Sequence, residues 1–375
     1  MTDDALPEPD CLPGAPHPRE TLQLHGQSTA EQAFLAAYAT GRLHHAWLLT
    51  GPRGIGKATL AWRIARFLIA TPEEQGGGLF GDAPAAPATL DVPPDHPAVR
   101  RMAALGEPRL HLLRRGPNDR GDRLSADIRV DVVRKMQSFL HLSAADGGRR
   151  VVIVDAADDL NTQSANALLK LLEEPPARVT FLLVAHQPSA LLPTIRSRCR
   201  ELRLSPLSPD DLALALAGAG VDAPPRGLAA LAQGSVGEAI RLSTLDGPET
   251  YARIVALFAT LPRLDRARAV AFADSAGGRG ADAEVRTDLA FALTETFLAR
   301  AAHRGATRHD QPEAAPGEAA LLARLAPDDR AGRAWADLHA TLGQRIRHGR
   351  AVNLDPAALL LDTVLKVSDT AGRLA

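Results

Sequence analysis

Apolar residues in the first half of the chain follow two patterns, short continuous runs and longer stretches with helical spacing. The clearest runs are AWLLT at 46–50, VVIVD at 151–155 and VTFLLVA at 179–185. Their length is that of buried strands, and a further strand is predicted at 109–115. Residues 58–70 and 162–174 instead place apolar side chains on one face of a helix. Strands that alternate with helices predict a parallel sheet covered on both faces, with ligands at the carboxyl ends of its strands.

The pattern becomes helical after residue 206. Short helices are predicted at 209–219, 225–233 and 236–243, and the rest of the chain after 246 is helical with short breaks. A single core rarely grows beyond about 250 residues, so a chain of 375 residues should divide. We expect an α/β domain at 1–206, a small helical domain at 207–246 and an all-helical domain at 247–375.

Two stretches show neither pattern. Residues 1–25 are acidic and rich in proline, and residues 74–96 are rich in glycine, proline and alanine. We expect the first to be flexible and the second to be a flexible insertion into the α/β domain. No secretory signal is visible at the start, and no apolar run approaches the roughly 18 residues of a membrane span. These features predict a cytoplasmic protein without a membrane partner.

The composition adds little to this picture and excludes some functions. The chain is 45% apolar and 23% charged, with a net charge of −1. No overall field therefore attracts nucleic acid, and any DNA contact must come from local patches or from partners. Only two cysteines are present, Cys11 and Cys199, which cannot form a disulfide framework or a thiolate zinc site. We expect no zinc.

The glycine-rich stretch GPRGIGKATL at 51–60 joins the first strand to the next helix. A phosphate-binding loop reads Gly, four residues, Gly-Lys and then Ser or Thr. The glycines and the lysine are present, but Ala58 stands where a hydroxyl would ligate magnesium. Thr59 lies about 100° further round the helix and is a poor substitute. The candidate nucleotide-binding residues are Gly51, Gly54, Gly56, Lys57, Thr59 and Asp155, and the sequence leaves open whether they still bind ATP or ADP.

The strand that ends at Asp155 carries a second departure. A hydrolysing P-loop ATPase of the acidic-pair type has an aspartate for the magnesium shell followed by a glutamate that activates water. Here Ala156 occupies the position of the glutamate. Hydrolysis is therefore not expected. The alternative is a genuine ATPase with an atypical magnesium site that uses Thr59 together with Asp158 or Asp159.

Several motifs together resemble the clamp-loader subunits of bacterial DNA polymerase III, which are AAA+ proteins that load the ring-shaped sliding clamp onto primed DNA. The matching stretches run in family order: 44-HHAWLLTGPRGIGKATLA-61, 128-IRVDVVR-134, 166-NALLKLLEEPP-176, 194-TIRSRC-199 and 234-GSVGEAIRL-242. They cover most of residues 40–245, and residues 352–365 also resemble the last helix of the family's collar. The resemblance implies an AAA+ domain, a helical lid and a helical collar that holds the subunits together.

Within this family, the choice lies between ATP-hydrolysing gamma/tau subunits and non-hydrolysing delta-prime subunits. Ala58, Ala156 and Gly237 each replace a residue that the family's ATPases use, Gly237 standing where the lid carries a phosphate-sensing arginine. Arg198 of the SRC motif is retained. A short basic run is by itself most often a solvated loop, but the resemblance implies that Arg198 is an arginine finger for a neighbouring subunit. These departures favour the delta-prime type.

The resemblance also implies partners. They are gamma/tau ATPase subunits, the delta subunit, the sliding clamp and primer–template DNA within the complex. No cofactor is required, and the chain itself is expected to lack ATPase and polymerase activity although it would belong to the polymerase III holoenzyme. A third possibility is a nucleotide-gated module of another AAA+ assembly. Lys170 and Glu173 in the LLEEPP helix are interpreted as fold-defining or interface residues.

Overall fold

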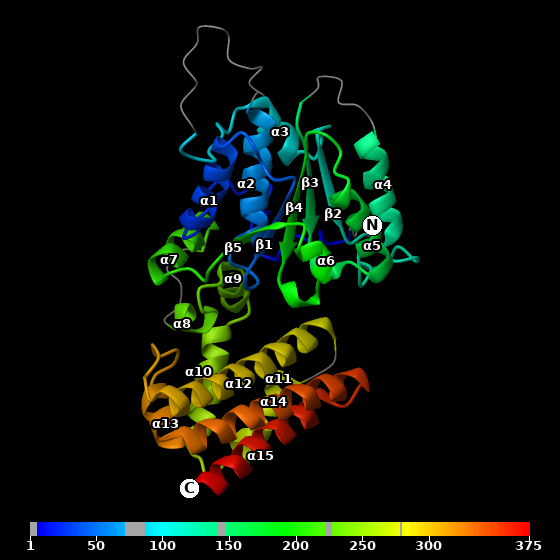
Figure 1. The fold of residues 1–375 in the computed structure, drawn as a ribbon. Coiled ribbons are helices and arrows are strands. Elements are labelled where there is room, and N and C mark those ends of the chain that lie inside the picture. Colours follow the sequence, from blue (N-terminus) through cyan, green and yellow to red (C-terminus); the bar gives the residue numbers. More distant parts are fainter. Residues whose placement is uncertain (1–5, 72–86, 142–147, 222–226, 278–279) are drawn as a thin grey trace, which may run out of the picture. The chain divides into compact units, whose positions relative to one another are not determined.

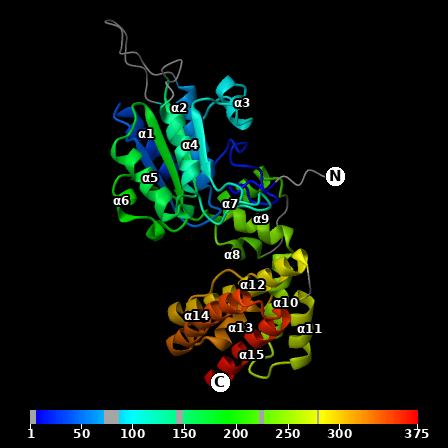
Figure 2. The same ribbon diagram turned by 90° about the vertical axis from the view of Figure 1, so that its right-hand side faces the viewer.

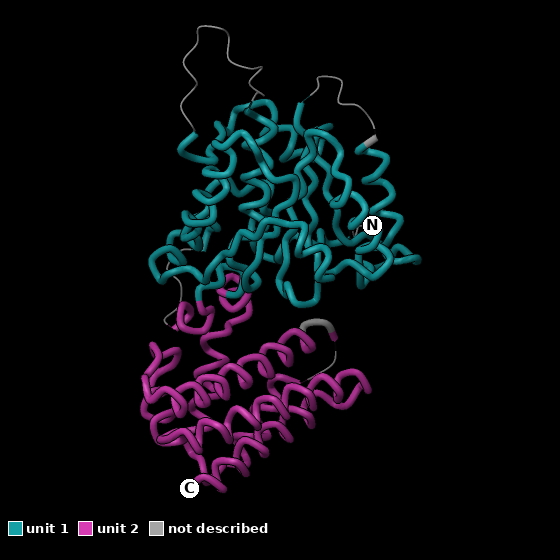
Figure 3. Tube along the Cα trace, in the orientation of Figure 1, with its two compact units in different colours: residues 1–221, 234–238 teal, residues 222–233, 239–375 magenta. Residues whose placement is uncertain are grey.

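The computed structural model describes residues 6–71, 87–141, 148–221, 227–277 and 280–375. The chain forms two compact units (Figure 3). The first contains residues 1–221 and 234–238, and the second contains residues 222–233 and 239–375. The predicted small helical domain at 207–246 is thus shared between the two units.

The first unit is built on a parallel sheet of five strands in the order β2-β3-β4-β1-β5 (Figure 1). The strands are β1 (Ala46–Thr50), β2 (Leu110–Arg114), β3 (Arg150–Asp155), β4 (Val179–Ala185) and β5 (Arg200–Arg203). Every residue of β1 and β4 is buried, because these central strands are covered on both faces. The predicted parallel sheet is confirmed, and the polar edge strand β5 is an addition to it.

Helices cover both faces of this sheet (Figures 1 and 2). They are α1 (Ser28–Ala39), α2 (Lys57–Ala70), α3 (Pro97–Ala103), α4 (Val130–His141), α5 (Thr162–Glu173), α6 (Pro193–Arg196) and α7 (Pro209–Gly218). α1, α2 and α3 lie on one side, and α4, α5 and α6 lie on the other. Alternate strand residues point to opposite faces, so Val152, Val154 and Leu183 pack with α4 and α5 in one apolar core.

The N-terminal segment differs from the flexible stretch that the sequence predicts. Residues 6–27 lie against α2, where Arg63 and Arg66 are only 7% and 3% exposed. Arg66 donates hydrogen bonds to the carbonyl oxygens of Arg19 at 2.9 Å and Thr21 at 2.7 Å, and Arg63 donates to that of Leu22. A buried guanidinium must find acceptors, so the backbone of this segment completes the packing of α2. Residues 74–86 of the predicted insertion at 74–96 lie outside the described residues.

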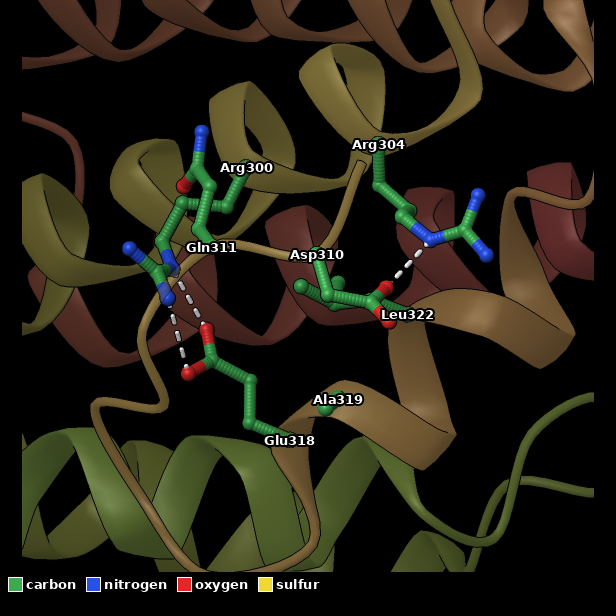
Figure 4. Close-up of a pocket in the computed structure, with 7 residues that line it drawn as sticks. All are labelled: Arg300, Arg304, Asp310, Gln311, Glu318, Ala319 and Leu322. Atoms are coloured by element: carbon green, nitrogen blue, oxygen red, sulfur yellow. Dashed lines mark hydrogen bonds and ion pairs between the residues drawn. The ribbon is translucent and has the colours of Figure 1, made fainter. Parts of the chain in front are cut away.

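The second unit is helical. Its helices are α8 (Leu228–Ala232), α9 (Val236–Thr244) from residue 239 onward, α10 (Gly247–Phe258), α11 (Arg266–Ala276), α12 (Ala281–Thr307), α13 (Glu318–Leu325), α14 (Asp329–Ala351) and α15 (Pro356–Leu374). α12 and α14 approach closely at two glycines, because a Cβ atom on Gly305 would lie 2.5 Å from the Cα atom of Gly332. Figure 4 shows a buried ion pair between Arg300 of α12 and Glu318 of α13. The all-helical prediction for this region is confirmed.

Candidate nucleotide site and exposed arginine

The glycine-rich loop follows β1 and ends where α2 begins at Lys57, as the sequence predicts. Gly51, Gly54 and Gly56 have φ values of 137°, 74° and 98°, which residues with a side chain rarely adopt. The loop is also tightly enclosed, because a Cβ atom on Gly51 would lie 2.7 Å from the carbonyl oxygen of Leu204. The chain therefore keeps the strand–loop–helix geometry of a phosphate-binding loop.

The lysine of this loop is directed back into the loop. Lys57 is 3% exposed, and its Nζ atom donates to the carbonyl oxygen of Gly51 at 2.6 Å and to that of Pro52. Burial lowers the pKa of Lys57 to about 8, although Asp155 and Asp158 oppose this shift. The cation that would neutralise phosphate charge is thus held by the carbonyl groups of its own loop.

Asp155 ends β3 and lies in the electrostatic range of Lys57. The pKa of Asp155 is raised to about 7, chiefly by burial and also by the negative charge of Asp10, whereas Lys57 opposes this shift. Ala156 follows and is 4% exposed. Asp155, the candidate magnesium ligand, therefore lies at the predicted strand end, and Ala156 beside it carries only a methyl group.

The two other acids that could replace a catalytic glutamate are engaged elsewhere. The carboxylate of Asp158 accepts hydrogen bonds from the backbone N–H groups of His186 at 2.9 Å and Gln187 at 3.3 Å. Asp159 forms an ion pair of 3.2 Å with Arg115. The contacts of Asp158 stabilise the loop after β4, and both carboxylates are engaged by groups of the protein itself.

His186 joins this group of charges although the sequence did not single it out. The pKa of His186 is lowered to about 4, chiefly by burial and also by the charge of Lys57, while Asp158 opposes both effects. The residue follows directly after β4, which pairs with β1 in the sheet. Its place directly after the apolar run VTFLLVA could have marked His186 as a site residue, since neighbouring parallel strands end at the same edge of the sheet.

A turn at 234–238 closes over the P-loop. Ser235 donates from Oγ to the carbonyl oxygen of Arg53 at 2.9 Å, and the N–H group of Gly237 donates to that of Gly54 at 3.0 Å. A Cβ atom on Gly237 would lie 3.0 Å from the Cα atom of Gly54. The position that carries an arginine in family ATPases is thus in backbone contact with the loop, and a long side chain there would require the turn to shift.

The N-terminal segment also contacts the loop. Gln27 donates from Nε2 to the carbonyl oxygens of Ile55 at 3.2 Å and Ser205 at 2.8 Å. The side chain of Leu24 would lie 2.5 Å from a Cβ atom on Gly56. The sequence does not predict that Gln27 and Leu24 contact the loop, because nothing in the pattern around them indicates a long-range contact.

Arg198 lies in the turn between α6 and β5, on the surface of the first unit. Its guanidinium is held by the carbonyl oxygen of Thr194 at 3.0 Å and by Oε1 of Glu173 at 2.8 Å. The side chain is 36% exposed and that of Glu173 is 44% exposed. Burial raises the pKa of the neighbouring Cys199 thiol to about 12, so Cys199 anchors the turn as an uncharged residue. Arg198 is therefore oriented and accessible.

The described residues hold no group of three or more His, Cys, Asp or Glu side chains placed to bind a metal ion. Among them, no helix is both long and apolar enough to cross a membrane.

Comparison with known proteins gives consistent relatives for the first unit. Residues 26–208 match the family model described as "DNA polymerase III, delta subunit". The chain is 39% identical over 155 residues to DNA polymerase III subunit delta' of Pseudomonas aeruginosa, covering 41% of each chain. It is 35% identical over 175 residues to the delta' subunit of Escherichia coli, covering 47% of this chain and 46% of that one.

A gamma subunit is also similar to this chain. DNA polymerase III subunit gamma of Buchnera aphidicola is 28% identical over 195 residues, covering 52% of this chain and 47% of that one. The chain thus spans less than half the length of these curated relatives.

Proposed function

We propose that this chain is a clamp-loader subunit of the DNA polymerase III delta-prime type and that it does not hydrolyse ATP, a proposal supported by the similarity of its residues 26–208 to that family. In this proposal it supplies Arg198 to the ATP site of a neighbouring subunit. The contrast between two sites supports the proposal: the P-loop is closed on itself, whereas Arg198 is held at the surface with its guanidinium accessible.

The first part of the proposal rests on the groups that hydrolysis needs. Ala58 offers no magnesium hydroxyl and Ala156 offers no base. Lys57 already donates to carbonyl oxygens of its loop, so binding a phosphate would require these hydrogen bonds to be given up. The alternative of an ATPase that uses Asp158 or Asp159 receives no support, because both carboxylates have other partners.

The second part rests on the chemistry of a guanidinium beside a transferring phosphoryl group. An arginine supplied by a neighbour stabilises the charge of the transition state and increases the rate by about 10³–10⁵-fold. Arg198 suits this role because Thr194 and Glu173 restrict its orientation while the side chain stays 36% exposed. Their exposed contacts are weak enough to be exchanged for a phosphate.

The partners follow from the same proposal. They are gamma/tau ATPase subunits, the delta subunit, the sliding clamp and primer–template DNA within the complex. The second unit would serve as the collar, since its long helices α12, α14 and α15 offer the extended surfaces that subunit contacts require. The chain would need neither zinc nor a nucleotide of its own.

The decisive experiment measures ATP turnover by the reconstituted loader with clamp and primed DNA. Arg198→Ala is expected to lower turnover at one ATP site by about 10³-fold or more, while size-exclusion chromatography shows an intact complex. Arg196→Ala is the matched control, because Arg196 ends α6 two residues before Arg198 and is exposed. Unchanged turnover in an intact Arg198→Ala complex would leave only a scaffold role.

Two further measurements separate the alternatives. ATP turnover by the isolated chain would favour an atypical ATPase. Copurification with an AAA+ complex other than the clamp-loader ATPase subunits would favour a nucleotide-gated module of another assembly.

A further inference from the structure

The N-terminal segment has two parts that contact the first unit differently. Residues 17–27 are built into the fold, since their carbonyl groups accept from Arg63 and Arg66 and Gln27 bridges two loops. Residues 8–12 instead lie at the end of the sheet where β2 and β3 stop (Figure 1, dark blue). We call residues 8–12 the N-terminal tip.

The tip is held by charge. Arg114, the last residue of β2, forms ion pairs with Oε1 of Glu8 at 3.2 Å and with Oδ1 of Asp10. His17 lies between the two acids, with its Nε2 atom 3.2 Å from Glu8 and 3.5 Å from Asp10. Arg19 forms a second ion pair of 2.6 Å with Glu8. Burial alone would raise the pKa of Asp10, but its contact with His17 and the charge of Arg114 bring the pKa below its usual value.

The position of the tip coincides with that of the candidate nucleotide site. Arg114 is in register with Asp155 in the sheet, so the Asp10 carboxylate lies in the electrostatic range of Asp155. Leu12 reaches the turn on the other side, where it would lie 3.4 Å from a Cβ atom on Gly237. The tip therefore runs from the magnesium-ligand position of β3 to the turn that closes the P-loop.

We propose that the N-terminal tip is a built-in plug of the P-loop site, held in place by Arg114, and that it excludes nucleotide by occupying the site and by its negative charge. Asp10 has a side chain that is 0% exposed beside Asp155, and carboxylates at this position repel the phosphate groups of a nucleotide. Leu12 fills the space beside Gly237. The P-loop becomes available when the tip is displaced.

This inference rests on the proposed function and deepens it, because it explains how a chain that keeps the P-loop fold would exclude nucleotide. It concerns the isolated chain alone. Its failure would leave the role of Arg198 untouched, and a failure of Arg198 to act on a neighbour would leave the plug untouched.

The test uses the full chain with two releasing variants, Arg114→Ala and the double variant Glu8→Gln/Asp10→Asn. The alkylation rate of Cys11 reports displacement of the tip, because the Sγ atom of Cys11 donates to the carbonyl oxygens of Leu12 and Ala15 when the tip is in place. A Cys199→Ser background removes the other cysteine. Nucleotide binding is measured with the fluorescent probe mant-ADP. Thermal unfolding identifies the variant that keeps its fold.

The proposal predicts that alkylation of Cys11 becomes at least about tenfold faster in a releasing variant and that mant-ADP binds at least about tenfold more tightly. Adding Lys57→Ala should abolish that gain, which assigns the binding to the P-loop. Arg129→Ala is the matched control, since it breaks an ion pair with Asp119 on the surface and should change neither measurement. Faster alkylation without tighter binding would overturn the plug, and unchanged alkylation in both folded variants would overturn the role of Arg114.

Discussion

The ion pair between Arg300 and Glu318 gives the sharpest prediction about the stability of the second unit (Figure 4). Glu318 is 0% exposed and Arg300 is 4% exposed. The carboxylate accepts from Arg300 at 2.6 and 3.1 Å, from the hydroxyl of Tyr251 at 2.5 Å and from the N–H group of Ala314 at 2.7 Å. Replacing Glu318 by alanine removes all of these acceptors and leaves Arg300 with the carbonyl oxygen of Pro312.

The expected cost follows from the charge left behind. Breaking a buried ion pair by removing one partner costs about 3–5 kcal/mol, because the other charge stays buried without compensation. For a unit of this size, each kcal/mol lowers Tm by about 2–4 °C, so Glu318→Ala should lower the Tm of the second unit by roughly 6–20 °C. Calorimetry measures the shift, and hydrogen exchange of α12 and α13 shows that it belongs to this unit.

The neighbouring pair in the same close-up is the matched control. Arg304 and Asp310 are 2.6 Å apart, but Asp310 is 62% exposed, and an exposed pair contributes at most about 1 kcal/mol. Asp310→Ala should therefore lower Tm by a few degrees at most. A loss in Glu318→Ala no larger than that in Asp310→Ala would refute the reasoning. The double variant Arg300→Met/Glu318→Met should recover much of the stability, since it leaves no buried charge.

Three predictions concern the first unit. Gly54→Ala should lower its free energy of unfolding by more than Gly121→Ala does in a denaturant titration, since both positions have φ near 70° but only Gly54 has backbone atoms within 3 Å of an added Cβ. The double change Ala58→Thr/Ala156→Glu should give no ATP turnover in the isolated chain, because Lys57 and the N-terminal tip still block the loop; turnover in a phosphate-release assay would contradict this. The raised pKa of Asp155, about 7 against an ordinary 3.8, means that the folded chain binds more protons than the unfolded chain between these values. The contribution of Asp155 to the free energy of unfolding is therefore fully present below about pH 4 and is lost as the pH rises through 7. Measured as Tm against pH, this decline should be absent in Asp155→Asn.

The sequence by itself determined the secondary structure wherever burial requires apolar residues at a regular spacing along the chain. AWLLT, VVIVD and VTFLLVA became β1, β3 and β4 because strands covered on both faces need uninterrupted apolar residues. The P-loop geometry and the positions of Ala58 and Ala156 were equally readable, since each depends on the order of a few adjacent residues. The helical prediction for the second unit held for the same reason.

Only the tertiary structure decided the contacts between residues far apart along the chain. The polar segment RELR became β5 because it pairs with β1 at the edge of the sheet, where strands need no apolar pattern. The N-terminal segment lies against α2 because buried arginines there require hydrogen-bond acceptors. The sequence of residues 6–27 does not predict this contact. Lys57 turns into its own loop to donate to the carbonyl oxygen of Gly51, and Gly237 donates to that of Gly54. Local composition predicts how a segment folds, whereas its partners are set by which charges and backbone groups remain to be satisfied once the core has formed.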